Sequence, residues 1–140
     1  MRVEVAVTVN RPVEDVYDAM ADARNEVIWN SQVSETELVS QPPVGQGATF
    51  RTVNRGNEYQ AVITDYQRPR RMEMSVSGKP MVIDAQMDFE DLGGSTRLSA
   101  TFDLQPRGFM KVLLPVISPV VRRDFPKQLA SFKAFCESRG

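Results

Sequence analysis

The sequence has no histidine and only one cysteine, Cys136, among its 140 residues. Histidine is the commonest general base and metal ligand, so its absence excludes nucleophile pairs of the Ser-His and Cys-His kind. With one cysteine, a zinc site would have to be built from carboxylates alone, against the usual ligand preference of zinc. We therefore predict no metal, no cofactor and no assignable catalytic residue. A cysteine without a disulfide partner also favours a reducing compartment.

The chain also lacks long apolar runs and a surplus of positive charge. Its longest apolar stretch, from Phe109 to Val121, contains a lysine and two prolines and is far shorter than the ~20 residues of a membrane span. The N-terminal residues mix charges with valines, so no signal-peptide core is present. With 17 basic and 18 acidic residues, the basic surplus typical of nucleic-acid binders is missing. We expect a cytoplasmic protein that neither spans a membrane nor binds nucleic acid.

The length and composition that remain are those of one globular domain. Apolar residues make up 41% of the chain and charged residues 25%, both ordinary for a globular protein. A chain of this size buries enough surface to form a core without disulfides or metals. We therefore predict a single domain over residues 1–140.

Hydrophobic periodicity divides most of the chain into strands. Residues 2–9 alternate valines with other residues, which predicts a half-buried strand. Apolar spacing after Pro12 predicts a short helix, and Asp22 suits the N-cap of a second short helix that Trp29 closes. Period-two alternation between short turns then predicts six antiparallel strands at 32–40, 48–54, 58–66, 71–77, 81–90 and 96–104.

The C-terminal segment returns to helical periodicity but contains Pro115, Pro119 and Pro126. Proline inside a helix removes a hydrogen bond and bends the axis. We therefore expect an irregular or kinked beginning and the most regular helix over about 119–138. Two apolar stripes are predicted, comprising Phe109, Val112, Leu113, Val116 and Val120, followed by Phe125, Leu129, Phe132 and Cys136.

These elements predict an α+β fold of strand, two short helices, six strands and a long helix. The apolar face of the sheet must be covered, and the C-terminal helix is the element long enough to cover it. A sheet of about seven strands that curves around one helix leaves a gap beside it. We therefore expect an internal cavity between the sheet and the helix.

Short motifs along the chain resemble, in the same order, those of a known superfamily. Pro12, Val16, Tyr17, Asp22 and Trp29 resemble an opening pattern P-x-x-x-V-[WY]…D…W, and Gly45-x-Gly47 resembles the glycine that precedes its next strand. Three later segments resemble its D-P-P-R-R-L turn, its G-G-T-x-L strand start and its closing L-x-x-L-K-x-x-x-E, namely 67–72, 94–98 and 129–137. The superfamily is the START-like or Bet v 1-like one (SRPBCC), and within it the polyketide cyclase/dehydrase group.

This resemblance covers nearly the whole chain and implies a helix-grip fold. It implies much less about function, because the superfamily includes lipid and sterol carriers, hormone receptors, polyketide aromatases and cyclases, and ribosome or chaperone partners. The chain departs from the pattern at Pro126, where the terminal helix is usually continuous.

Strand alternation selects the side chains that face the expected cavity. Inward methionines are either ordinary core or an adaptable pocket wall, and inward alanines leave room beside them. Trp29 either plugs the end of the sheet or contacts ligand, and Tyr59 is the best candidate for a polar contact. The predicted ligand-binding residues are Trp29, Phe50, Thr52, Tyr59, Ala61, Met72, Met74, Ala85, Met87, Phe102, Val116 and Val120.

Asp124 follows two arginines, and this run predicts a solvated helix face. The alternative is a carboxylate turned into the cavity, where a raised pKa suits it to acid or base work.

Three functions follow as hypotheses. The first is non-covalent binding of a small hydrophobic molecule, such as a lipid, polyketide or aromatic metabolite. The second is a polyketide cyclase or dehydratase-type enzyme, in which a shaped cavity positions a chain and Tyr, Thr or Asp moves protons. The third is a protein-interaction module of the ribosome- or chaperone-associated kind. The missing histidine favours the first, while the ligand's identity and any protein partner stay unassigned.

Overall fold

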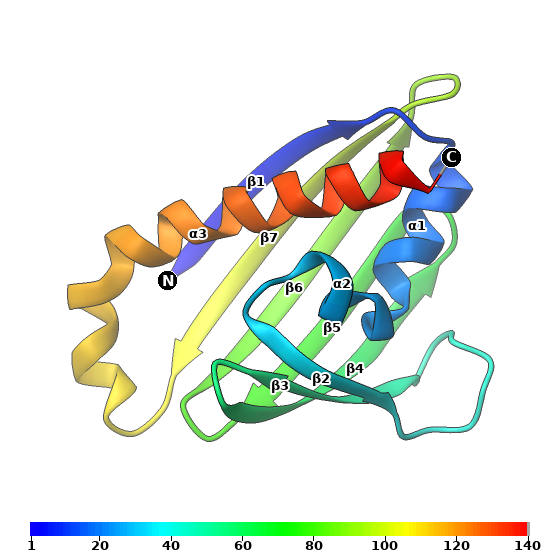
Figure 1. The fold of residues 1–140 in the computed structure, drawn as a ribbon. Coiled ribbons are helices and arrows are strands. Elements are labelled where there is room, and N and C mark those ends of the chain that lie inside the picture. Colours follow the sequence, from blue (N-terminus) through cyan, green and yellow to red (C-terminus); the bar gives the residue numbers. More distant parts are fainter. Residues whose placement is uncertain (140) are drawn as a thin grey trace.

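A computed structural model describes residues 1–139 and contains the elements in the predicted order. β1 is followed by two short helices joined through a 3₁₀ turn, by six strands and by one long helix (Figure 1). Their bounds are β1 Arg2–Val9, α1 Val13–Ala21, η1 Ala23–Asn25, α2 Glu26–Trp29, β2 Val33–Leu38, β3 Thr49–Asn54, β4 Asn57–Gln67, β5 Arg71–Gly78, β6 Met81–Asp91, β7 Thr96–Pro106 and α3 Met110–Ser138.

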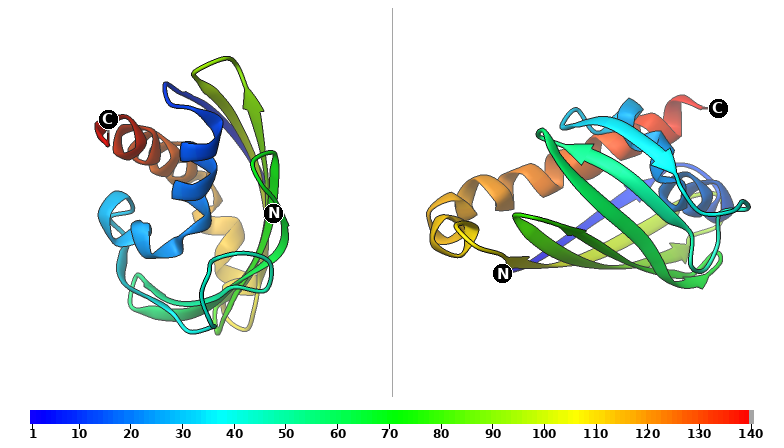
Figure 2. Two further views of the ribbon diagram at one scale, coloured as in Figure 1. Left: turned by 90° about the vertical axis from the view of Figure 1, so that its right-hand side faces the viewer. Right: turned by 90° about the horizontal axis from the view of Figure 1, so that it is seen from below.

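The strands form one antiparallel sheet in the order β1-β7-β6-β5-β4-β3-β2. The chain therefore runs as a meander from β2 to β7, and β1 closes the far edge by pairing with β7. Figure 2 shows the sheet curving, with α3 and the short helices on its concave side. The predicted α+β helix-grip architecture is confirmed. Within residues 1–139, no helix is long and apolar enough to cross a membrane.

Asp22 is an N-cap as predicted, although the element that it caps begins as a 3₁₀ turn, and Pro12 is the N-cap of α1 rather than its first helical residue. Asp22 caps the 3₁₀ turn, its carboxylate accepting a hydrogen bond from the backbone N–H of Arg24 at 3.1 Å. In α1 the buried Tyr17 packs edge-on against Tyr66 and Phe89, with ring centroids 5.3 Å and 4.9 Å away. This aromatic cluster fixes α1 over one end of the sheet.

The C-terminal half of α3 also follows its predicted stripe. Leu129, Phe132 and Cys136 are buried against the sheet and the short helices. Phe132 meets Trp29 of α2 edge-on, with 5.3 Å between ring centroids. Burial raises the pKa of the Cys136 thiol to about 11, so this cysteine serves the core rather than thiolate chemistry.

α3 is one helical element from Met110 to Ser138. Helix therefore extends further toward the N-terminus than the regular stretch predicted over about 119–138, and it continues through Pro126. Figure 1 shows the first turns of α3 bending away from the axis of the rest, which confirms the kinked beginning. Pro115 and Pro119 lie in this half, each removing a backbone donor from the helix.

The predicted stripe through Val116 and Val120 is wrong. Val116 is 74% exposed, Val120 is also exposed, and neither lines the cavity. The inner stripe is shifted by one residue, and it consists of Met110, Leu114, Ile117, Val121 and Phe125. This stripe runs into Leu129 at four-residue spacing. The phase was ambiguous because almost every residue from Phe109 to Val121 is apolar.

Replacing Tyr17 with phenylalanine tests how firmly α1 is held. The Tyr17 hydroxyl donates a hydrogen bond to the Arg71 carbonyl at 2.9 Å, and burial raises its pKa to about 12, which keeps it a donor. Removing it leaves a part-buried carbonyl without this partner, so we expect Tyr17→Phe to lower the unfolding free energy by about 1–3 kcal/mol. Urea unfolding measures the loss.

The matched control is Tyr66→Phe. The Tyr66 hydroxyl makes no hydrogen bond to another described residue, so its removal is expected to change stability by less than about 0.5 kcal/mol. Equal losses in the two variants would show that the Tyr17 bond is not what holds α1.

Candidate functional site

A cavity of about 430 Å³ lies between the concave face of the sheet, α2 and α3. Strands β3 to β7 supply one wall, and the inner stripe of α3 supplies the other. Its size falls within the range of small-molecule sites. The cavity therefore occupies the gap that a curved sheet and a single covering helix were expected to leave.

The sheet wall combines flexible and small side chains. Ala85 on β6 stands between its cross-strand partners Met74 on β5 and Phe102 on β7, and all three line the cavity. The structure brings together eight predicted residues in this lining, namely Trp29, Thr52, Tyr59, Ala61, Met74, Ala85, Met87 and Phe102.

Two predicted residues face inward without lining the cavity. Phe50 and Met72 are fully buried in the same cluster as Val16 and Tyr17 of α1. Alternation identifies the face of a strand on which a side chain lies, but not the position along that face where packing closes. The end of the sheet beneath α1 is a filled core.

A polar end of the cavity joins α3 to two loops. Arg55, in the β3–β4 turn, donates to the Asp124 carboxylate of α3 at 2.8 Å. Gln128 of α3 donates to the Gln32 side chain at 3.0 Å, and all four residues line the cavity. The expected solvated position of Asp124 is wrong, because its side chain is only 17% exposed.

The turn that presents Arg55 is conformationally unusual. Arg55 has φ +50° and Gly56 has φ +80°, the left-handed conformation that tight hairpins require at both central residues. Glycine adopts it freely, whereas arginine does so at some cost. The less favourable backbone conformation therefore occurs at Arg55, the residue whose side chain forms the ion pair with α3.

Two polar groups of α2 lie inside the cavity lining, Glu26 and Trp29. The Trp29 indole Nε1 is buried and has no hydrogen-bond partner among the described residues. Glu26 is of intermediate exposure, and burial of its carboxyl group raises the pKa to about 7. Sequence analysis missed Glu26, although its place three residues before Trp29 puts both on one side of a helical turn.

Thr52 and Tyr59 form a second polar pair, as direct cross-strand partners on β3 and β4. Burial raises the pKa of Tyr59, so its hydroxyl stays protonated near neutral pH. The Tyr59 ring packs against Gly78 of β5, where an added Cβ would approach ring carbon Cδ1 to 2.6 Å. Glycine at position 78 thus sets the position of the ring.

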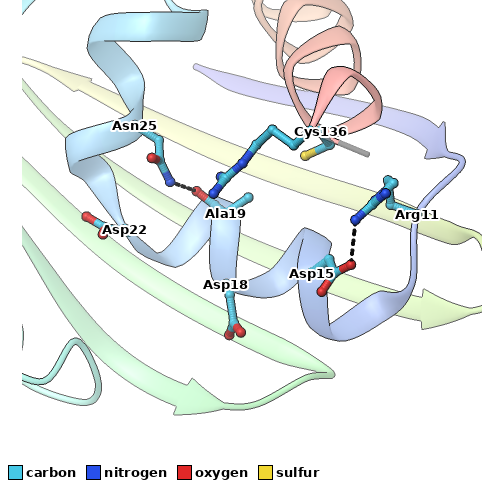
Figure 3. A pocket seen from close by; sticks show the side chains of 8 residues that line it. Arg11, Asp15, Asp18, Ala19, Asp22, Asn25 and Cys136 are labelled. Atoms are coloured by element: carbon cyan, nitrogen blue, oxygen red, sulfur yellow. Dashed lines mark hydrogen bonds and ion pairs between the residues drawn. The ribbon is translucent and has the colours of Figure 1, made fainter.

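A second hollow, also of about 430 Å³, lies between α1 and the end of α3 (Figure 3). Its lining is largely charged, and most of its polar side chains already have partners, either within the lining or in neighbouring residues. Arg11 donates to Asp15 at 2.9 Å, and Asn25 donates to the Ala19 carbonyl at 3.0 Å. Its charged rim and lack of an apolar wall make it a poorer small-molecule site than the cavity under α3.

Comparison with known proteins identifies relatives of the whole chain. A family model described as "Polyketide cyclase / dehydrase and lipid transport" matches residues 1–137. No curated protein matches the chain in sequence. The relatives described here give no support to the ribosome- or chaperone-associated hypothesis.

Solved structures with the same fold are numerous but distant in sequence. An aromatase/cyclase, ZhuI from Streptomyces sp. R1128, superposes with a TM-score of 0.82 at 19% identity, over 99% of this chain and 94% of its own. A START superfamily protein from Mycobacterium smegmatis gives 0.75 at 17% identity, over 99% and 95%. A protein from Thermus thermophilus gives 0.78 at 15% identity, over 100% and 99%. At these identities the likeness shows the fold alone.

Proposed function

This chain belongs to the polyketide cyclase / dehydrase and lipid transport family, and from that premise we propose that it binds a small, largely apolar molecule non-covalently. The binding site is the cavity between the sheet and α3. The observation that carries the proposal is the cavity itself, about 430 Å³ in volume and walled mainly by apolar side chains.

The composition of the wall favours a ligand-binding site over an empty volume left by imperfect packing. Protein interiors are normally close-packed, and an unfilled apolar cavity lowers the free energy of unfolding. Here Met74 and Met87, with flexible thioether side chains, stand beside Ala61 and Ala85 around the open volume. A wall of this kind adapts to apolar ligands of different shape.

Native mass spectrometry of gently purified protein tests the proposal directly. The protein is offered a panel of fatty acids, methyl ketones and polycyclic aromatic ketones and phenols. We expect a one-to-one complex with at least one class. Absence of any adduct, together with a crystal structure whose side chains fill the cavity, would refute the proposal.

The single tryptophan provides an internal reporter of binding. Trp29 is the only tryptophan in the chain and lines the cavity, so an aromatic ligand bound there is expected to change its emission with one-to-one saturation. Trp29→Phe removes the signal, and calorimetry on that variant should still detect binding. A ligand that saturates by calorimetry without changing Trp29 emission would lie outside this cavity.

A second candidate function is an enzyme of the cyclase or dehydratase type. The specific observation in its favour is Glu26, a carboxyl group facing the cavity whose pKa is raised to about 7 by burial. A group with such a pKa gives and takes protons efficiently near neutral pH. Under this hypothesis Glu26→Gln abolishes turnover of a polyketide-like substrate and retains its binding, whereas unchanged turnover would exclude Glu26 as the acid or base.

A further inference from the structure

We propose that Glu26 and Trp29 make the cavity selective for uncharged ligands that carry a hydrogen-bonding oxygen on an apolar body. Free carboxylates, including fatty acids, are excluded. The inference rests on the proposed binding function and names the chemical class of the ligand. It is carried by the charges and hydrogen-bonding groups that line the cavity.

The first step is the balance of charge. Of the described residues that line the cavity, three carry ionisable charge at neutral pH, namely Glu26, Arg55 and Asp124. The Arg55 guanidinium is already paired with the Asp124 carboxylate at 2.8 Å. The lining therefore offers an anionic head group no cation that lacks a carboxylate partner, although Arg123, outside the lining, also approaches Asp124 at 3.7 Å. Moving a carboxylate into an apolar site without a counter-ion is strongly unfavourable.

The second step is the position of Glu26. Its carboxyl group makes no hydrogen bond or ion pair with another described residue, and burial is the sole cause of its raised pKa. A ligand carboxylate in the same cavity would add like-charge repulsion in surroundings of low dielectric constant. Glu26 thus disfavours anions beyond the general cost of desolvation.

The third step is the unpaired donor of Trp29. Its buried Nε1–H has no acceptor among the described residues, and leaving such a group unpaired costs roughly 1–3 kcal/mol. A ligand carbonyl, ether or hydroxyl oxygen would recover that cost by accepting the bond. Since Glu26 lies three residues earlier on the same short helix, its protonated carboxyl group presents a second donor on the same side.

The preference for uncharged ligands over carboxylates is expected to depend on pH, because the charge of Glu26 changes with pH. The other titratable groups in the lining are Arg55, Tyr59 and Asp124. Below pH 7, Glu26 is mostly protonated and does not repel an anion. Above pH 7 it is mostly ionised, so discrimination against carboxylates should increase from pH 6 to pH 8.

The test compares 2-acetonaphthone with 2-naphthoate by isothermal titration calorimetry. Both have the same ring system and a carbonyl oxygen, and they differ in charge. We expect the full chain at pH 8 to bind the ketone at least tenfold more tightly. Glu26→Gln should reduce the ratio to about threefold or less by strengthening naphthoate binding. Trp29→Phe should weaken ketone binding about tenfold, the equivalent of one lost hydrogen bond.

The control is Glu90→Gln, which removes an exposed carboxylate outside the cavity lining and should leave both affinities unchanged. Equal affinities for the two compounds, or tighter naphthoate binding, would overturn the selectivity and leave the binding function standing. If neither compound binds and the broader panel also gives no complex, the proposed function fails and the selectivity fails with it.

Discussion

Ala85→Phe is expected to weaken binding of an apolar ligand at least tenfold and to leave the fold intact. Ala85 lies in the middle of the sheet wall, between Met74 and Phe102, and its side chain faces the open volume of about 430 Å³. A phenyl ring added there occupies volume that the ligand needs, without displacing close-packed atoms. Tenfold corresponds to about 1.4 kcal/mol, less than the burial of one aromatic side chain provides.

Two alanines provide matched controls for this substitution. Ala130 is exposed on α3, so Ala130→Phe should change neither binding nor stability appreciably. Ala100 faces inward from β7 but lies in the closed core, so Ala100→Phe should lower stability by about 1–3 kcal/mol through overpacking. If Ala85→Phe destabilises the protein as much as Ala100→Phe, the cavity is not open in solution. If it leaves affinity unchanged, the ligand binds elsewhere.

The sheet wall was the part of the site that sequence alone described best. A strand presents alternate side chains to opposite faces with a fixed period, and this geometry placed Met74 and Ala85 on the inner face, where they are cross-strand partners. The same rule misassigned Phe50 and Met72 to the cavity. It does not tell which end of the inner face α1 covers, because that depends on packing between distant segments.

The helix wall was harder to predict for a different reason. Helical phase is read from the contrast between apolar and polar positions, and the stretch before Arg122 has little contrast. The correct phase was available from the following stripe, since Phe125 extends backward at four-residue steps to Val121 and then Ile117. Asp124 lies on the same inner side of α3. The two arginines before it in the sequence had suggested an exposed helix face.

The polar end of the cavity depended on contacts between residues far apart in the chain. Arg55 and Asp124 are 69 positions apart, and no local pattern links a hairpin turn to a helix. Glu26 had no distinguishing pattern at all, because a glutamate in the first turn of a short helix is ordinary. Only the fold shows that its carboxyl group faces an apolar cavity.

Glu26→Gln is expected to stabilise the protein increasingly as pH rises. Burial raises the pKa of Glu26 from an ordinary 4.5 to about 7, so between these values the unfolded chain releases a proton that the folded chain retains. The contribution of Glu26 to the free energy of unfolding is therefore greatest below pH 4.5, decreases as the pH rises from 4.5 to 7, and is constant above pH 7. The total loss is up to about 3 kcal/mol, reduced by the remaining exposure of the residue to water.

Glutamine has nearly the same shape and carries no charge to desolvate, so the variant lacks this loss. Urea unfolding of both proteins at pH 4, 6 and 8 should give a difference near zero at pH 4 that grows in favour of the variant. Other carboxyl groups titrate equally in both proteins and cancel in the difference. Glu90→Gln, at an exposed position, should show no such trend.

A flat difference for Glu26→Gln would mean that its carboxyl group is as well hydrated in the folded chain as in the unfolded one. The charge balance proposed to exclude carboxylates would then lose its main element, while the apolar wall around Ala85 would be unaffected.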